Sequence, residues 1–425
     1  MTSLGGVQRI DFATATPYLL RMTTAPIVRF LDRTTAPHIS TLILMTGLSA
    51  VNLSIILPSL NGMAVHFGTS YAVMQLALSG YLAMTAFLQV FVGPISDRFG
   101  RRRIILIAIA IFVLASIGAL LAPNVETFLF FRMLQAAVAT SMALSRAIVR
   151  DMVPQDQAAS MIGYVTMGMA LVPMFGPMIG GLLDQLFGWQ STFVFLSIVG
   201  TAVFLLCFFD QGETVKSGGT SFSDQLRSYP ELLKSPRFWG YTMCSTFSAG
   251  AFFALLGGAS FIAESVFNLT PLWSGIALGV PACGYMAGNY LSGRFSVSVG
   301  VNRMVLLGGG ILIAGLGTSL FITLIGFKHP LLFFGFCIFL GLGNGLILPN
   351  ASAGTVSVRP HLAGTASGLS GAIMVGGGAA LSAWAGSLLT AQTGTLPLQW
   401  IMLGTSVLAV ASILVVIRRE AQIKA

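Results

Sequence analysis

Long apolar stretches alternate with short polar connections from about residue 38 to residue 418. A membrane-spanning α-helix needs ~20 consecutive apolar residues, and each stretch is close to that length. The pattern therefore predicts an all-α polytopic membrane protein with twelve transmembrane helices in two sets of six. The predicted spans cover residues 41–60, 71–92, 104–122, 127–148, 161–183 and 190–209, and then 238–262, 272–293, 304–326, 331–353, 364–389 and 397–417.

A polar segment between the two sets divides the chain. It contains Gly, Ser and charged residues, which are typical of a linker between halves. The first 37 residues mix Thr, Ala and Pro with four arginines and lack the apolar core of a secretory signal, so we interpret them as a cytoplasmic tail. An organelle transit peptide is the alternative. The expected organisation is a tail at 1–37, a six-helix half at 38–210, a linker at 211–237, a six-helix half at 238–418 and a tail at 419–425.

Composition supports a membrane protein and argues against several other classes. Hydrophobic residues make up 55% of the chain and charged residues 8%, against about 25% charged residues in soluble domains. The net charge of +9 comes from basic residues in short connections rather than from one amphipathic face, so we expect no nucleic-acid partner. The four cysteines lie singly in apolar segments, and HExxH, GxSxG and Walker patterns are absent from the sequence. We therefore expect no metal, no cofactor and no enzyme activity.

The basic residues predict the topology. The even-numbered connections and both tails hold 20 of the 22 Lys and Arg residues. Because cytoplasmic loops carry an excess of Lys and Arg, both termini are expected in the cytoplasm. Arg132 is the one basic residue placed within a predicted span.

A densely charged segment at 93–103 is predicted to form the loop between the second and third spans. It has an echo 200 residues later, where Gly93, Gly100 and Arg103 meet Gly293, Gly300 and Arg303, while Asp97 meets Val297. The second copy keeps the glycines and loses the charge pair. Two halves related along the membrane normal are typical of a rocking transporter with a site at the midplane.

Three motifs resemble those of the major facilitator superfamily, and the resemblance covers nearly all of residues 38–420. The loop at 93–103 is similar to the family's signature between spans two and three. Arg132-Met133-Leu134-Gln135 resembles an arginine motif of proton-coupled members, with Ala136 where glycine is usual. The third motif is Gly168 followed by Gly176-Pro177-Met178-Ile179-Gly180-Gly181, which is similar to the antiporter motif of exporters.

The resemblance implies a conformational lock in the charged loop. In the family, the aspartate of this loop pairs with cytoplasmic helix ends and holds one conformation. By position this implies a switch made of Gly93, Asp97, Arg98, Gly100 and Arg101. An orientation anchor is the simpler alternative, since any basic cytoplasmic loop satisfies the same charge rule.

Two further segments, Ser145–Asp151 and Leu348–Ala351, resemble the Bcr/CflA branch of drug-resistance exporters. This implies a monomer in the bacterial inner membrane that exports small amphipathic compounds by rocker-switch alternating access, with proton antiport. A metabolite importer or facilitator of the same fold is the alternative, and a receptor or membrane enzyme is the alternative outside transport. The branch commonly has an acid where Ser54 stands, so coupling that is absent, peripheral or carried by the substrate stays open, and a preference for cationic drugs is in doubt.

Arg132 is the leading candidate for a residue that takes part in ion coupling or lines the substrate cavity. A charge inside a membrane is a functional-site hypothesis by default, and Gln135, one turn away, can share its hydrogen bonds. We expect Arg132 to face a cavity, where an unpaired cation favours neutral or anionic substrates. The alternative is that it reaches the outer boundary and pairs with Glu126. The acids nearest the spans, Glu126, Asp184 and Glu264, fall at span ends.

The remaining candidates are polar residues and helix breakers inside the spans. The polar ones are expected to line a cavity or to act only as interhelical contacts. The proline and glycine cluster of span five is expected to form a bent pivot or plain packing. The polar candidates are Asn52, Ser54, Tyr285, Asn289, Asn344 and Asn350, and the cluster is Pro173, Gly176, Pro177, Gly180 and Gly181.

Overall fold

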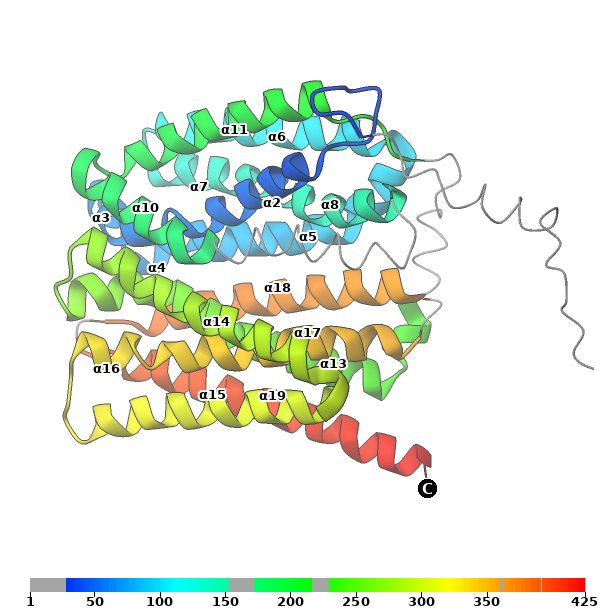
Figure 1. Cartoon of the computed structure of the whole chain (residues 1–425). Helices are drawn as coiled ribbons and strands as arrows, with labels where there is room; N and C mark the ends of the chain where they lie inside the picture. The colour runs from blue at the N-terminus through cyan, green and yellow to red at the C-terminus, as the bar shows by residue number, and fades with distance from the viewer. Residues whose placement is uncertain (1–27, 153–171, 216–228, 360–361, 391, 425) are drawn as a thin grey trace, which may run out of the picture.

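The computed structural model describes residues 28–152, 172–215, 229–359, 362–390 and 392–424. Figure 1 shows two helical bundles stacked against each other, with the first half of the chain in blue to green and the second in green to red. Within the described residues the regular secondary structure is helical. The predicted all-α fold class is confirmed.

The first half contains nine described α-helices and two short 3-10 helices. They are α2 (Ile39–Ser54), η1 (Leu57–Ser59), α3 (Leu60–His66), α4 (Tyr71–Met74), α5 (Leu76–Phe99), α6 (Arg101–Leu120), α7 (Val125–Leu134), η2 (Gln135–Val138), α8 (Ala139–Met152), α10 (Val172–Phe187) and α11 (Gln190–Asp210). The second half contains α13 (Pro236–Phe261), the π-helix η3 (Ile262–Val266), α14 (Pro271–Val299), α15 (Val301–Leu324), α16 (Pro330–Phe334), α17 (Cys337–Ser357), α18 (Ala363–Leu388) and α19 (Leu396–Lys424).

Ten helical segments of the described chain are long and apolar enough to cross a membrane. Two more helices complete a set that is compatible with the twelve predicted spans. One is α14, which has 29 residues, and the other is α10, which adjoins residues outside the described ranges. The chain is therefore a multi-pass membrane protein.

The predicted loop at 93–103 is wrong, because this segment is almost entirely helical. Helix α5 continues through Pro94 to Phe99, and α6 begins at Arg101. Only Gly100 separates them, with a φ of 92° that a residue with a side chain rarely adopts. Gly300, with a φ of 93°, makes the same turn between α14 and α15. The polar ends stay helical because their backbone groups keep their i→i−4 hydrogen bonds.

Part of the predicted N-terminal tail is fixed to the first half by Asp210, a fully buried residue at the end of α11. Its carboxylate accepts hydrogen bonds from the backbone N–H groups of Leu31 (2.7 Å) and His38 (2.9 Å) and from the hydroxyl of Thr41 (2.7 Å). Three donors compensate the burial of this charge and tie the start of α2 to the end of α11. The expected boundary at residue 37 therefore falls inside a packed segment.

The two halves meet along two helix pairs, α5 with α18 and α10 with α14. We call the end of the bundle with the turns at Gly100 and Gly300 the basic end, and the other the opposite end. Figure 1 places the C-terminus at the basic end and helices α3, α4 and α16 at the opposite end.

Candidate functional site

An ion cluster at the basic end joins four helices of the first half. Arg101, at the start of α6, pairs with Asp97 near the end of α5 (2.9 Å) and with Asp151 at the end of α8 (2.5 Å). The backbone N–H groups of Arg101 and Arg102 donate to the carboxylate of Glu213, which follows α11 (2.9 and 3.3 Å). An anion at a helix N-terminus is stabilised by the free N–H groups and the helix dipole.

The cluster differs in membership from the predicted switch. Arg98 is exposed and stacks on Phe99, with 5.4 Å between the guanidinium carbon and the ring centroid. Gly93 lies inside α5, with no atom within 4 Å of where a side chain would begin. The structure therefore brings together Asp97, Gly100 and Arg101 and leaves Arg98 and Gly93 apart from them. Asp151 and Glu213 are partners that were not predicted.

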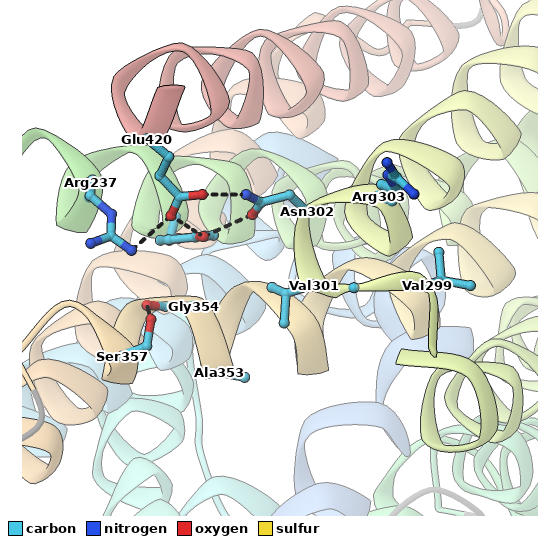
Figure 2. Close-up of a pocket in the computed structure, with 11 residues that line it drawn as sticks. Arg237, Val299, Val301, Asn302, Arg303, Ala353, Gly354, Ser357 and Glu420 are labelled. Atoms are coloured by element: carbon cyan, nitrogen blue, oxygen red, sulfur yellow. Dashed lines mark hydrogen bonds and ion pairs between the residues drawn. The ribbon is translucent and has the colours of Figure 1, made fainter. Parts of the chain in front are cut away.

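The second half has a related cluster built from other residues. Glu420, near the end of α19, accepts hydrogen bonds from Arg237 (2.7 Å), Asn302 (2.7 Å) and the hydroxyl of Tyr241 (3.2 Å). Figure 2 shows this carboxylate between Arg237 and Asn302, beside a cavity of about 390 Å³. In each half, a glutamate at or just after the end of the last span thus holds the start of the third span, which is α6 in the first half and α15 in the second. The repeat at an offset of 200 residues did not predict this similarity between the two glutamates, because it aligns Glu213 with Ile413 and not with Glu420.

Neutralising Asp97 tests the lock. In Asp97→Asn, Arg101 keeps Asp151 but loses one of its two ion pairs. The side chains of Arg101 and Asp97 are 11% and 23% exposed, and Arg101 keeps a second carboxylate, so we expect a loss of ~1 kcal/mol and a fall in transport of about two- to fivefold at unchanged membrane abundance. The measurement is the initial rate of export normalised to the amount of protein in the membrane. Arg98→Gln, one residue away, is the matched control and should retain the wild-type rate. Unchanged transport in Asp97→Asn would leave the segment with an orienting role only.

Arg132 lies in the middle of the first half and is fully buried. Its guanidinium donates to the Asn52 side-chain oxygen (2.7 Å), the Asn52 carbonyl (2.9 Å), the Gln135 side-chain oxygen (2.7 Å) and the Ala77 carbonyl (3.0 Å). The ring of Tyr81 lies beneath it, with 4.5 Å between the guanidinium carbon and the ring centroid. Gln135 continues the chain of bonds to Ser116 (2.7 Å). One side chain thereby connects the first four spans.

These contacts correct both expectations for Arg132. The guanidinium faces side chains of its own half rather than a cavity, and Glu126 is not its counter-ion. Instead, neutral oxygens and one aromatic face compensate the charge within the described residues, which is possible because the planar guanidinium donates in several directions at once. The 3-10 helix η2 begins directly after this point, and a mid-helix 3-10 turn often marks a hinge.

Two of the polar candidates of the second half form interhelical contacts. Asn344 accepts a hydrogen bond from Ser248 of α13, and Asn350 donates to Ser292 of α14 (2.8 Å). Asn289 donates to the carbonyl of Tyr285 in its own helix (2.8 Å). Both Asn344 and Asn350 are buried. The contacts favour the interhelical alternative over a cavity lining for Asn344 and Asn350, whereas Asn289 and Tyr285 are half-buried and are bonded within α14.

The glycines of α10 allow close approach to two different helices. A side chain at Gly176 would overlap the hydroxyl of Ser54, and one at Gly180 would overlap the Ile55 carbonyl, both in the first half. Gly181 faces the Pro271 carbonyl of the second half, and Gly275 of α14 faces the Pro177 carbonyl in return. Backbones from both halves therefore touch across this seam. Pro173 lies in the first turn of α10, and Gly168 lies outside the described residues.

Hydrogen bonds close the opposite end between the halves. Tyr71 donates to the Gly257 carbonyl (3.0 Å), Gln75 donates to the hydroxyl of Ser382 (2.8 Å), and Ser260 donates to the Leu57 carbonyl. We call these three contacts the seal. None of its residues was predicted as functional. The signal that could have found it is the placement of Tyr71 and Gln75 at the very start of a span, where both polar groups need partners.

Comparisons with known proteins agree with this architecture. The family model described as Major Facilitator Superfamily matches residues 42–383. The chain is 29% identical to the uncharacterized MFS-type transporter YdgK of Bacillus subtilis over 85% of this chain and 90% of that protein. It is 28% identical to the bicyclomycin resistance protein homolog of Haemophilus influenzae over 84% and 90%. A crystal structure of the peptide transporter POT in complex with sulfate superposes with a TM-score of 0.70 at 14% identity, covering 89% and 94%, which supports the fold.

Proposed function

This chain belongs to the Major Facilitator Superfamily, and we propose that it exports small amphipathic compounds by rocking its two halves about the seams between them. Relatives named for bicyclomycin, chloramphenicol and multidrug resistance support drug efflux. The observation that most supports rocking is the α10–α14 seam, where reciprocal glycine contacts let two backbones touch across the halves. Small residues at a helix interface allow such close approach and sliding.

We propose that the basic end faces the cytoplasm, with both termini inside, in a bacterial inner membrane. The ion clusters of both halves lie at that end, and an excess of Lys and Arg is typical of the cytoplasmic side of a membrane protein. The opposite end, which the seal closes, is then the outer end, so this conformation is sealed on the outer side. One chain contains both halves of the transport unit, which makes a monomer sufficient. The switch residues Asp97 and Arg101 would stabilise one of the two conformations within the first half.

The substrate class follows from the charge of the first half. Arg132 does not face the space between the halves, but its hydrogen-bond partners are neutral, so its charge raises the electrostatic potential of the first half. We expect neutral or anionic compounds to be preferred over lipophilic cations. No catalytic activity is needed for this function, and any uphill transport must use an ion gradient.

Accumulation in cells tests export directly. Cells that lack their own exporters would express the chain and be loaded with a lipophilic cation, a neutral antibiotic and an anionic dye, with and without a proton uncoupler. Export predicts lower accumulation of the neutral or anionic compound than in cells with an empty vector, and the uncoupler should abolish the difference. Higher accumulation would instead favour the importer alternative. Efflux of the cation alone would contradict the proposed substrate charge.

A further inference from the structure

Two carboxyl groups from opposite halves act on each other beside the seal. Glu264 lies in the π-helix η3 at the end of the first span of the second half, and Asp184 lies near the end of α10. The side chain of Asn61, in α3, interacts with Glu264, and so does the carboxyl of Asp184. Asp184 in turn has Ser59 of η1 as its polar neighbour. The group therefore draws residues from three elements of the first half and one of the second.

The site lacks a compensating cation within the described part of the chain. Neither Glu264 nor Asp184 forms an ion pair there, whereas the ion pairs that we find lie at the basic end. The other titratable group that faces Glu264 is Tyr71, whose hydroxyl is engaged with Gly257 (3.0 Å). The His66 ring packs on the rings of Phe67 and Trp189 instead, at 5.0 and 5.3 Å between centroids.

Two polar atoms at the site are buried without a hydrogen-bond partner. One is the Oε1 atom of Glu264, and the other is the hydroxyl oxygen of Ser59, a residue with no exposed surface. Buried polar groups almost always have hydrogen-bond partners. Two such atoms without a partner, one of them on Glu264 itself, indicate a site that takes up a further species. The π-helix is a second sign, because such single turns occur frequently at functional sites.

The chemistry of the site selects a proton. Two partly buried carboxylates that act on each other repel and lose part of their hydration, and one bound proton removes the repulsion. We propose that the Glu264–Asp184 pair is a proton-binding site of the outer seal. As the halves close, a hydronium ion of the outer water gives its proton to one carboxylate oxygen, and an O–H bond forms. When the halves part, both groups are hydrated again and the proton returns to the outer water.

This proposal rests on the proposed function, since a seal that opens and closes belongs to a transporter whose halves rock. Because the proton returns to the side from which it came, the site makes the seal respond to outer pH and does not itself carry protons across the membrane. Outer acidity then favours the sealed conformation. The Ser260–Leu57 contact, one turn before η3, holds Glu264 partly buried, so that the carboxyl becomes fully hydrated only when the halves separate.

A distance measurement across the outer end tests the site. Spin labels at Val65→Cys and Leu331→Cys, both exposed and on opposite halves, report the separation in lipid nanodiscs, with the exposed Cys283 replaced by Ser. The wild type should shift from the short to the long distance as the pH rises. Glu264→Gln should keep the short distance across the range, or shift the midpoint by at least about one pH unit. Asp184→Asn should do the same.

The matched control is Glu126→Gln, which neutralises an exposed acid at the same end and should keep the wild-type pH response. A wild-type response in both Glu264→Gln and Asp184→Asn would overturn the proposal, as would a distance that follows sodium concentration at constant pH. If one variant fails to fold, the other decides. The cellular accumulation assay separates the two proposals, because a seal that responds to pH in a chain without export would contradict the proposed function alone.

Discussion

Replacing Arg132 by lysine is expected to lower the export rate about tenfold or more while the charge stays in place. The guanidinium makes four hydrogen bonds in different directions, to Asn52, Gln135 and Ala77. A compact ammonium cannot reach all four oxygens at once. Each buried acceptor left without a donor costs ~1–3 kcal/mol, and the contacts among the first four spans loosen with it. Initial export rates and thermal unfolding in detergent would both be measured.

The matched control for Arg132→Lys is Arg103→Lys, the same exchange at an exposed position of the basic end. It should change neither the rate nor the unfolding temperature. If Arg132→Lys exports normally, the directional geometry of the guanidinium is not required and charge alone suffices. A loss of stability without a loss of rate per folded molecule would assign Arg132 a purely structural role.

Adding a side chain at Gly181 is expected to give the second large effect, an export rate lowered about tenfold or more. In Gly181→Val, the new atoms overlap the Pro271 carbonyl of the other half, so the sealed conformation cannot form as described. Overpacking of this kind costs ~1–3 kcal/mol, and here the cost falls on one of the two conformations. Export rates and the label distance between Val65 and Leu331 positions would be measured, and the long distance should dominate.

Gly310→Val provides the control, because no atom lies within 4 Å of the position where its side chain would begin. It introduces the same strain of a β-branched residue in a helix without a contact between halves. Equal losses of transport in Gly181→Val and Gly310→Val would mean that the effect is one of helix stability. Gly275→Val, on the facing helix, should reproduce Gly181→Val.

The fold was predictable because its information is local. Apolar stretches of membrane-crossing length follow directly from residue order. The predicted linker at 211–237 stays a prediction, because residues 216–228 lie outside the described ranges. The boundaries at the helix ends were less predictable, as the segment at 93–103 illustrates. Its charges predict a loop, yet its backbone remains helical and turns at Gly100 alone. Charge reports where a segment lies relative to the membrane, whereas hydrogen bonding decides its conformation.

The site was predictable only in part. The pairing of Asp97 with Arg101 and the bond from Arg132 to Gln135 join residues only four and three positions apart, so both follow from short spacing along the chain. The partners from other helices do not, and Asp151, Glu213, Asp210 and Tyr81 were found only in three dimensions. For Asn344 and Asn350, the sequence allowed either a cavity lining or an interhelical contact. The structure shows a hydrogen bond between each of these residues and a neighbouring helix.

By itself, the sequence determined that this chain crosses the membrane many times in two related halves, with its arginines gathered at one end. Those features depend on the free energy of transferring each residue into hydrocarbon, which is a property of that residue and its near neighbours. The tertiary structure decided which polar groups meet. It enclosed Arg132 among neutral oxygens, set glycine against backbone between the halves, and placed Glu264 near Asp184 from 80 residues away in sequence. Such contacts depend on distances between helices that residue order does not specify.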